Sequence, residues 1–287
     1  MGMTSSAALP ADIVRGIRNL EPLPVTAQRL LELVNGRNVG LASIAELIEF
    51  DPTITALVLR GAATAARAGY GVPTVREAVM RLGTVALLDL VMDGYLARLR
   101  VAAPLYDLSE HDLWLHGAAT QLAVRALAVE RPKAGIPPLA ETAALLHDIG
   151  KLIVSRYLHA DVRELVKHAQ VRGIMFVEAE RELLGVDHTV VGAAIAEAWH
   201  FPPVIVEAIR RHHSPPFAEP NVVLDAVALA NVVAKTIQTG LGAEGLNFDV
   251  DPGSYRRLGV DFAAFGRVCL QTEAWLRAVT DTHSLHR

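Results

Sequence analysis

The chain has 287 residues, of which 52% are hydrophobic and 20% are charged. This is enough for a sizeable core in one large or two ordinary domains, and it argues against extended disorder. The net charge of −4 argues against broad nucleic-acid binding. No uncharged apolar run reaches the ~18–20 residues of a membrane span. The single cysteine, Cys269, excludes an internal disulfide, and no secretory leader is recognisable, so we predict a cytoplasmic protein.

Signals for helix starts recur through the first part of the chain. Ser43–Glu46 and Thr74–Glu77 both have the capping-box pattern, in which a hydroxyl residue precedes a glutamate by three positions. Asp51 followed by Pro52 predicts another helix start, because proline at the first helical position needs no N–H partner. Alternating apolar runs joined by hairpin turns are absent. We therefore predict an all-α fold whose first helical lobe covers residues 13–104.

A second helical lobe is predicted over residues 105–287. Pro104–Ser109 is interpreted as the connector between the lobes. Ser109–Asp112 predicts the start of a helix that continues through Leu113–Glu130, with an acid in its first turn. The two lobes are expected to pack together, and the residues after about 235 are expected to form a closing helical extension.

Metal-ligating residue types gather in the second lobe. His147 and Asp148 are adjacent near the end of an apolar helix predicted over Ala143–Leu152. Neighbouring side chains point ~100° apart on a helix, yet a short aspartate and a longer histidine can converge on one ion. Lys151, four residues after His147, lies on the same face and is suited to hold a phosphate or an anionic leaving group.

Four more histidines have apolar neighbours: His116, His188, His212 and His213. Asp187 is a predicted N-cap for the helix that begins near His188. His212 and His213 close the predicted helix Pro203–Arg211, where the helix dipole favours a cation. One such histidine is more often a satisfied core residue than a ligand, so only the whole set predicts a metal site. These ligand types suit zinc, iron, manganese or nickel, and the sequence does not choose among them.

The order of these residues resembles the HD phosphohydrolase superfamily, including the HD-GYP cyclic-dinucleotide phosphodiesterases. The resemblance implies a first metal held by His116, His147 and Asp148. Asp148 would bridge to a second metal, whose other ligands would be His188, His212 and His213. Lys151 matches the catalytic lysine of the superfamily, so Lys151 and Asp148 are the catalytic candidates if the chain is an enzyme.

Two features depart from the superfamily pattern. Ser214–Phe217 stands where a glycine-tyrosine-proline element is expected, and Asn231 stands where the last metal-binding aspartate is expected. An amide is neutral and a weaker ligand than a carboxylate. Asp225 could compensate, but it lies six residues earlier and ~120° around the helix.

The first lobe resembles the N-terminal half of HDOD domains. The stretches that carry the resemblance are Leu20–Pro24, Leu41–Pro52, Leu57–Arg60 and Val75–Gly83. It extends over about residues 13–235 and implies an all-helical bacterial signalling-output module. Such modules often occur near response regulators or cyclic-dinucleotide components, and most are thought to have lost hydrolase activity.

Three functions stay open. The chain is a non-catalytic scaffold that binds a partner or small ligand, a metal-dependent phosphohydrolase or phosphodiesterase, or a metal sensor without turnover. Asn231 favours the first function, whereas the six candidate ligands and Lys151 favour the second, with one or two divalent ions as cofactor. No receiver or cyclase pattern accompanies the domain. The expected partners are therefore signalling proteins encoded elsewhere, with a nucleotide or phosphate as the small ligand and neither nucleic acid nor membrane.

Overall fold

The computed structural model describes most of the chain, namely residues 9–21, 23–34, 40–65, 74–96, 102–109, 111–158, 160–213, 221–244 and 251–284. Over these ranges the chain is helical and contains no strand, apart from one isolated bridge between Ala103 and Leu108. This confirms the all-α prediction. No helix in the described ranges is long and apolar enough to cross a membrane.

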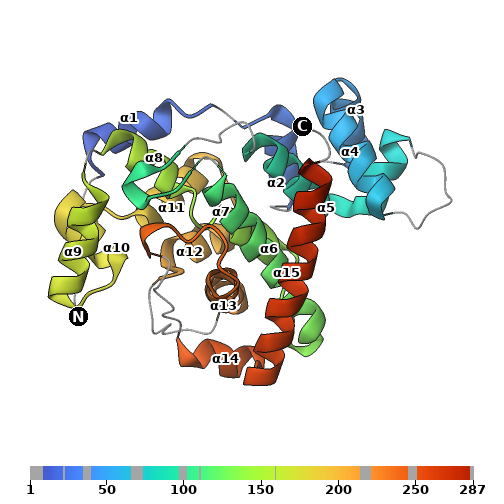
Figure 1. Ribbon diagram of the computed structural model, residues 1–287. Helices are drawn as coiled ribbons and strands as arrows, with labels where there is room; N and C mark the ends of the chain where they lie inside the picture. Colours follow the sequence, from blue (N-terminus) through green and yellow to red (C-terminus); the bar gives the residue numbers. More distant parts are fainter. Residues whose placement is uncertain are drawn as a thin grey trace.

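Helix α5 is the centre of the first group of helices. The helices of this group are α1 (Ala11–Arg18), α2 (Val25–Val34), α3 (Leu41–Glu49), α4 (Pro52–Ala65) and α5 (Val75–Leu96). α2, α3 and α4 all pack against α5, and Figure 1 shows α3 and α4 together at one end of the molecule. α1 instead packs against helices that follow residue 105.

In the first group of helices, the helix starts follow the local sequence at two of the three predicted positions. The Asp51 carboxylate accepts a hydrogen bond from the Ile54 amide at 3.1 Å, which caps α4. Thr74 and Glu77 exchange the two hydrogen bonds of a capping box. The prediction at Ser43 is wrong, because α3 already begins at Leu41 and has no side-chain cap. The Ser43 amide bonds to the Gly40 carbonyl, so this residue lies inside the first turn.

The helices after residue 105 pack around a core that is rich in alanine. They are α6 (Asp112–Glu130), α7 (Leu139–Leu146), α8 (Gly150–Tyr157), α9 (Val162–Arg172), α10 (Phe176–Leu184), α11 (His188–Ala198), α12 (Pro203–Arg211), α13 (Val222–Thr236), α14 (Pro252–Leu258) and α15 (Phe262–Ser284). α13 packs against α6, α7, α12, α14 and α15, and α15 lies along α6 (Figure 1). Ala226, Ala230 and Ala234 of α13 are fully buried, so neighbouring backbones can approach closely.

One hydrophobic core extends through both groups of helices. It joins Leu87 and Leu88 of α5 to Leu146 of α7 and Ile13 of α1. Because the core is shared, the prediction of two lobes divided between residues 104 and 105 remains a proposal. Polar contacts cross the same junction, since the Trp114 indole donates to the Asp93 carboxylate at 2.9 Å.

Asp89 is a buried carboxyl group at the junction of α5 and α7. The Thr142 hydroxyl donates a hydrogen bond to it. Burial is the main cause that raises the pKa of Asp89 from 3.8 to about 7, although the Thr142 hydrogen bond opposes the rise. Between these two pKa values the folded state binds a proton that the unfolded state has released. Stability therefore falls as the pH rises across this window and levels off above about pH 7.

Asp89→Asn should remove this pH dependence, because the amide stays neutral and its oxygen still accepts the Thr142 hydrogen bond. The native protein should lose roughly 1.4 kcal/mol per pH unit relative to the variant within the window. Thermal unfolding from pH 5 to pH 8 should show a Tm advantage of the variant that grows with pH. The exposed-site variant Asp12→Asn is the control. A Tm difference between Asp89→Asn and native protein that is the same at every pH would contradict the assignment.

Candidate metal centre

Asp148 lies in the turn between α7 and α8. The sequence analysis placed His147 and Asp148 inside one helix, and this is wrong, because α7 ends at Leu146 and α8 begins at Gly150. A Cβ atom on Gly150 would lie 1.9 Å from the His188 carbonyl oxygen, so only glycine permits this approach of α8 to α11. The close contact brings His188 beside Asp148.

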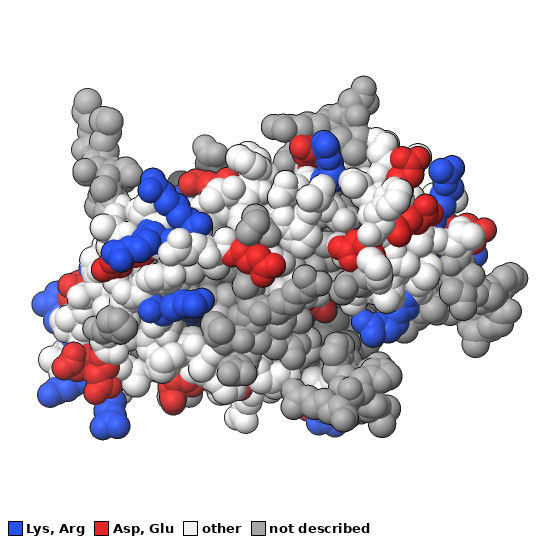
Figure 2. Space-filling view, turned by 90° about the horizontal axis from the view of Figure 1, so that it is seen from above, with Lys and Arg blue, Asp and Glu red and all other residues white. Residues whose placement is uncertain are grey.

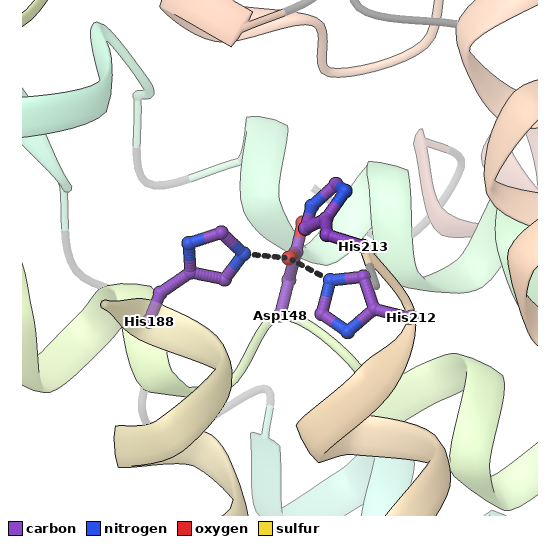
Figure 3. A group of neighbouring side chains, drawn as sticks. All are labelled: Asp148, His188, His212 and His213. Atoms are coloured by element: carbon purple, nitrogen blue, oxygen red, sulfur yellow. Dashed lines mark ion pairs between the residues drawn. The ribbon is translucent and has the colours of Figure 1, made fainter. Parts of the chain in front are cut away.

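The two carboxylate oxygens of Asp148 face different histidines. Oδ2 lies 3.6 Å from His116 Nε2 and 3.4 Å from His147 Nε2. Oδ1 lies 3.4 Å from His188 Nε2 and 3.5 Å from His212 Nε2, and Figure 3 shows these two rings on opposite sides of the carboxylate. Asp148 therefore has the position of a bridge between two sets of nitrogen ligands.

The structure brings all six predicted ligands together. One group is formed by His116, His147 and Asp148, and the other by Asp148, His188, His212 and His213. In each group the candidate ligand atoms all lie within 4.8 Å of one another, and every residue is buried. The elements that supply them are α6, the turn after α7, the start of α11 and the end of α12. Asp187 caps α11 as predicted and so fixes the position of His188.

Four of the five histidines have their second ring nitrogen bound to an oxygen atom. The Nδ1 partners are the carbonyl oxygens of Thr239, Ala144 and Ile209 for His116, His147 and His212, and the Glu180 carboxylate for His188. A carbonyl oxygen or a carboxylate can only accept, and a neutral imidazole has one N–H. In His147 and His212 that proton is therefore on Nδ1, and the Nε2 lone pair faces Asp148. His116 differs, because its Nε2 atom also lies 3.1 Å from the Asn231 amide oxygen, and a neutral ring donates to only one of these two oxygens.

The protonation states of the cluster favour a cation. Burial lowers the pKa of His116 to about 4 and lowers the pKa of His147, His212 and His213 as well, so these rings are neutral at pH 7. Burial alone would raise the pKa of Asp148, but neighbouring positive charge, which includes the Lys151 ammonium group at 2.7 Å, holds that pKa well below its usual value. The Asp148 carboxylate thus lies beside the lone pairs of neutral imidazoles, an arrangement that attracts a cation.

The donor atoms fit a divalent ion. Among the described residues, His147 Nε2, His188 Nε2, His212 Nε2 and Asp148 Oδ1 are buried and have no hydrogen-bond partner. Two ligands that are each ~2.1 Å from a tetrahedral ion lie ~3.4 Å from each other. The four distances from Asp148 to the rings, from 3.4 to 3.6 Å, match this separation. Histidine and carboxylate donors suit zinc, iron, manganese and nickel alike.

Lys151 and Asn231 complete the side of Asp148 that faces His116. The Lys151 ammonium group donates to Asp148 Oδ2 at 2.7 Å. Asn231, on α13, places its amide oxygen 3.1 Å from His116 Nε2. Asp225 does not replace the missing carboxylate, because Ser254 and Arg257 bind both of its oxygens at 2.6–2.7 Å.

Three buried residues around the cluster were missed by the sequence analysis. Glu180 of α10 is fully buried and links the Tyr106 hydroxyl to His188. The Tyr106 ring lies in the segment that was interpreted as a connector, with the Lys151 ammonium 5.5 Å from its centroid. Lys235 is buried one turn after Asn231 on α13. Glu180 is surrounded by charged residues in the sequence, which is typical of a solvated helix face, so no local signal marked it.

The fold and the buried histidine–aspartate cluster define a helical protein of the HD type. The family model described as "HDOD domain" matches residues 20–215, which is more than half of the chain. The chain therefore belongs to the HDOD family.

Solved structures support the fold, and one curated protein is a distant relative in sequence. An HDOD domain protein of unknown function from Geobacter sulfurreducens has a TM-score of 0.71 and 24% identity, covering 94% of this chain and 95% of that one. A proposed phosphohydrolase from Shewanella amazonensis has a TM-score of 0.59 and 27% identity, covering 91% and 98% of the two chains. An uncharacterized protein of Treponema pallidum is 24% identical over 236 residues, or 81% of this chain. The chain spans only 45% of that relative's length.

Asp148→Ala should abolish metal binding, because it removes the one carboxylate that both groups of histidines share. Divalent metal at about 100 times Kd should stabilise the native protein by about 2.7 kcal/mol, a rise in Tm of roughly 5–10 °C. The variant should show no metal-dependent rise, whereas the surface variant Asp12→Ala should behave like the native protein. Full metal occupancy of Asp148→Ala, measured by elemental analysis, would show that the ligand assignment is wrong.

Proposed function

We propose that this chain is a bacterial signal-transduction output module that holds a divalent ion in its HD-like core and acts by binding signalling partners, without hydrolysing phosphoesters. The observation that carries the proposal is the contact of Asn231 with His116, at the place where the superfamily pattern requires an aspartate. Membership of the HDOD family supports the signalling role.

The neutral amide of Asn231 weakens the side of the cluster that faces His116. A two-metal hydrolase uses carboxylates to offset the charge of both ions, and it uses the ions to activate water and to clamp the phosphate oxygens. On this side Asp148 supplies the only carboxylate among the grouped ligands. Its Oδ2 atom is already bound by the Lys151 ammonium group. The same lysine would have to face the substrate in order to neutralise charge that develops on a phosphate.

A metal-dependent phosphohydrolase or phosphodiesterase is the second candidate. The convergence of six candidate ligand residues in two groups that share Asp148 favours it, and so does the similarity to a proposed phosphohydrolase of Shewanella amazonensis. In that reading Asp148 and the histidines hold the ions, and Lys151 leaves Asp148 to bind the phosphate. A catalytic ion needs only three protein ligands plus water, so the loss of one carboxylate weakens this reading without removing it.

The partners that we propose are signalling proteins encoded elsewhere, in the cytoplasm, with a nucleotide or phosphate as the small ligand. Lysine and arginine side chains lie among aspartate and glutamate side chains on the face shown in Figure 2. A surface of mixed charge suits a protein partner, since complementary pairs fix the register and speed the encounter.

The comparison of native protein with Asn231→Asp separates the two candidates. Native protein supplied with manganese or iron should not hydrolyse cyclic dinucleotides or a generic phosphodiester above the metal-free rate. The variant regains a carboxylate beside His116, so its metal-dependent rate should exceed the native rate by on the order of 10–100-fold. Asn221→Asp, at the N-cap of α13, is the matched control and should stay inactive. Brisk metal-dependent turnover by the native protein would refute the non-catalytic proposal.

A further inference from the structure

The two oxygens of Asp148 have unequal surroundings. Oδ2 accepts a hydrogen bond of 2.7 Å from the Lys151 ammonium group. Oδ1 is buried and has no hydrogen-bond partner among the described residues. A buried carboxylate oxygen is stable only when a positive charge or a donor compensates it. Lys151 fulfils this need at Oδ2. At Oδ1 a bound cation would fulfil it.

The ligand sets on the two sides are also unequal. The Oδ1 side combines the carboxylate with three imidazoles, from His188, His212 and His213 (Figure 3). This is the complete four-ligand set of a closed tetrahedral site. The Oδ2 side combines the same carboxylate with two imidazoles, from His116 and His147, and its remaining neighbour is the neutral amide of Asn231.

Glu180 strengthens the Oδ1 side alone. Its Oε2 atom accepts the His188 Nδ1 proton at 2.7 Å, and the Tyr106 hydroxyl donates to its other oxygen. A carboxylate behind a ligating histidine fixes the ring and makes Nε2 a stronger donor to a metal. The histidines on the other side have only neutral carbonyl groups at this position.

A second ion would have to share Asp148 with the first. Asp148 is the only carboxylate in either group of candidate ligands, and the Lys151 ammonium group donates to its Oδ2 atom. A second ion would therefore meet a cation that is already in place, without a carboxylate of its own. Uncompensated charge is costly in a buried site, which disfavours the second ion.

We infer that the protein binds one divalent ion tightly, on the Oδ1 side, through His188, His212, His213 and Asp148. Glu180 is the positioning residue that sets its affinity, and the Lys151 ammonium group replaces a second ion at Oδ2. This inference rests on the metal binding put forward in the proposed function. It adds the number of ions and their position, as well as the residue that controls affinity.

The test is a metal titration of the full chain after treatment with a chelator, using zinc and, separately, manganese. Calorimetry gives the affinity, and elemental analysis of the desalted protein counts the ions. Native protein should bind one ion per chain. Glu180→Gln should weaken its binding by on the order of 10–100-fold, which is the usual effect of removing such a partner. His116→Ala should retain one ion with little change in affinity.

Glu182→Gln is the matched control. Like Glu180, Glu182 forms a hydrogen bond with a histidine, His168 at 2.6 Å, but this pair lies on the surface. It should leave the titration unchanged. Lys151→Met removes the ammonium group from Oδ2 and should raise the count toward two ions. This gain of binding provides a test that does not depend on the folding of Glu180→Gln, and circular dichroism of each variant checks its fold.

Two results would overturn the inference while metal binding itself stood. One is the binding of two ions of equal affinity by the native protein. The other is loss of the tight ion in His116→Ala together with its full retention in Glu180→Gln. Native protein that binds neither zinc nor manganese would overturn both this inference and the metal-binding part of the proposed function.

Discussion

The burial of the Asp148 carboxylate among neutral imidazoles is the interaction on which the centre of this structure depends. Desolvating a carboxylate is expensive, and here the rings that surround it offer lone pairs instead of protons. The helices pack tightly enough to hold this arrangement because glycines stand where backbones meet. A Cβ atom on Gly117 would lie 2.8 Å from the Leu145 carbonyl oxygen, and one on Gly192 would lie 3.2 Å from the Gly150 amide nitrogen.

The groups behind the histidines tie the cluster to distant parts of the chain. The Tyr106 hydroxyl reaches Glu180 from the segment that joins the two groups of helices, 74 residues earlier in the sequence. The Thr239 carbonyl, beyond the end of α13, orients His116 across a separation of 123 residues. A change in the packing of either segment would therefore alter the orientation of a ligand. This is a physical route by which a partner bound to the helical surface could sense or influence metal binding.

The difference between binding and hydrolysis in this chain rests on few atoms. Asn231 keeps the shape of an aspartate but lacks its charge, and the Lys151 ammonium group is used to compensate Asp148. Both features make the cluster more neutral without a second ion. In the function proposed above, the cluster keeps the ligand order of the superfamily while its electrostatics favour retention of an ion over turnover.

The sequence by itself determined the helical class, the order of the candidate ligands and the helix starts at Asp51, Thr74 and Asp187, because these depend on residues close together in the chain. Only the tertiary structure decided the rest. The close approach at Gly150 places Asp148 in a turn, and Arg257 binds Asp225 from 32 residues away. Glu180 is buried against a histidine of the next helix. These outcomes depend on which helix faces meet, and that information is spread over the whole chain instead of residing in any local pattern.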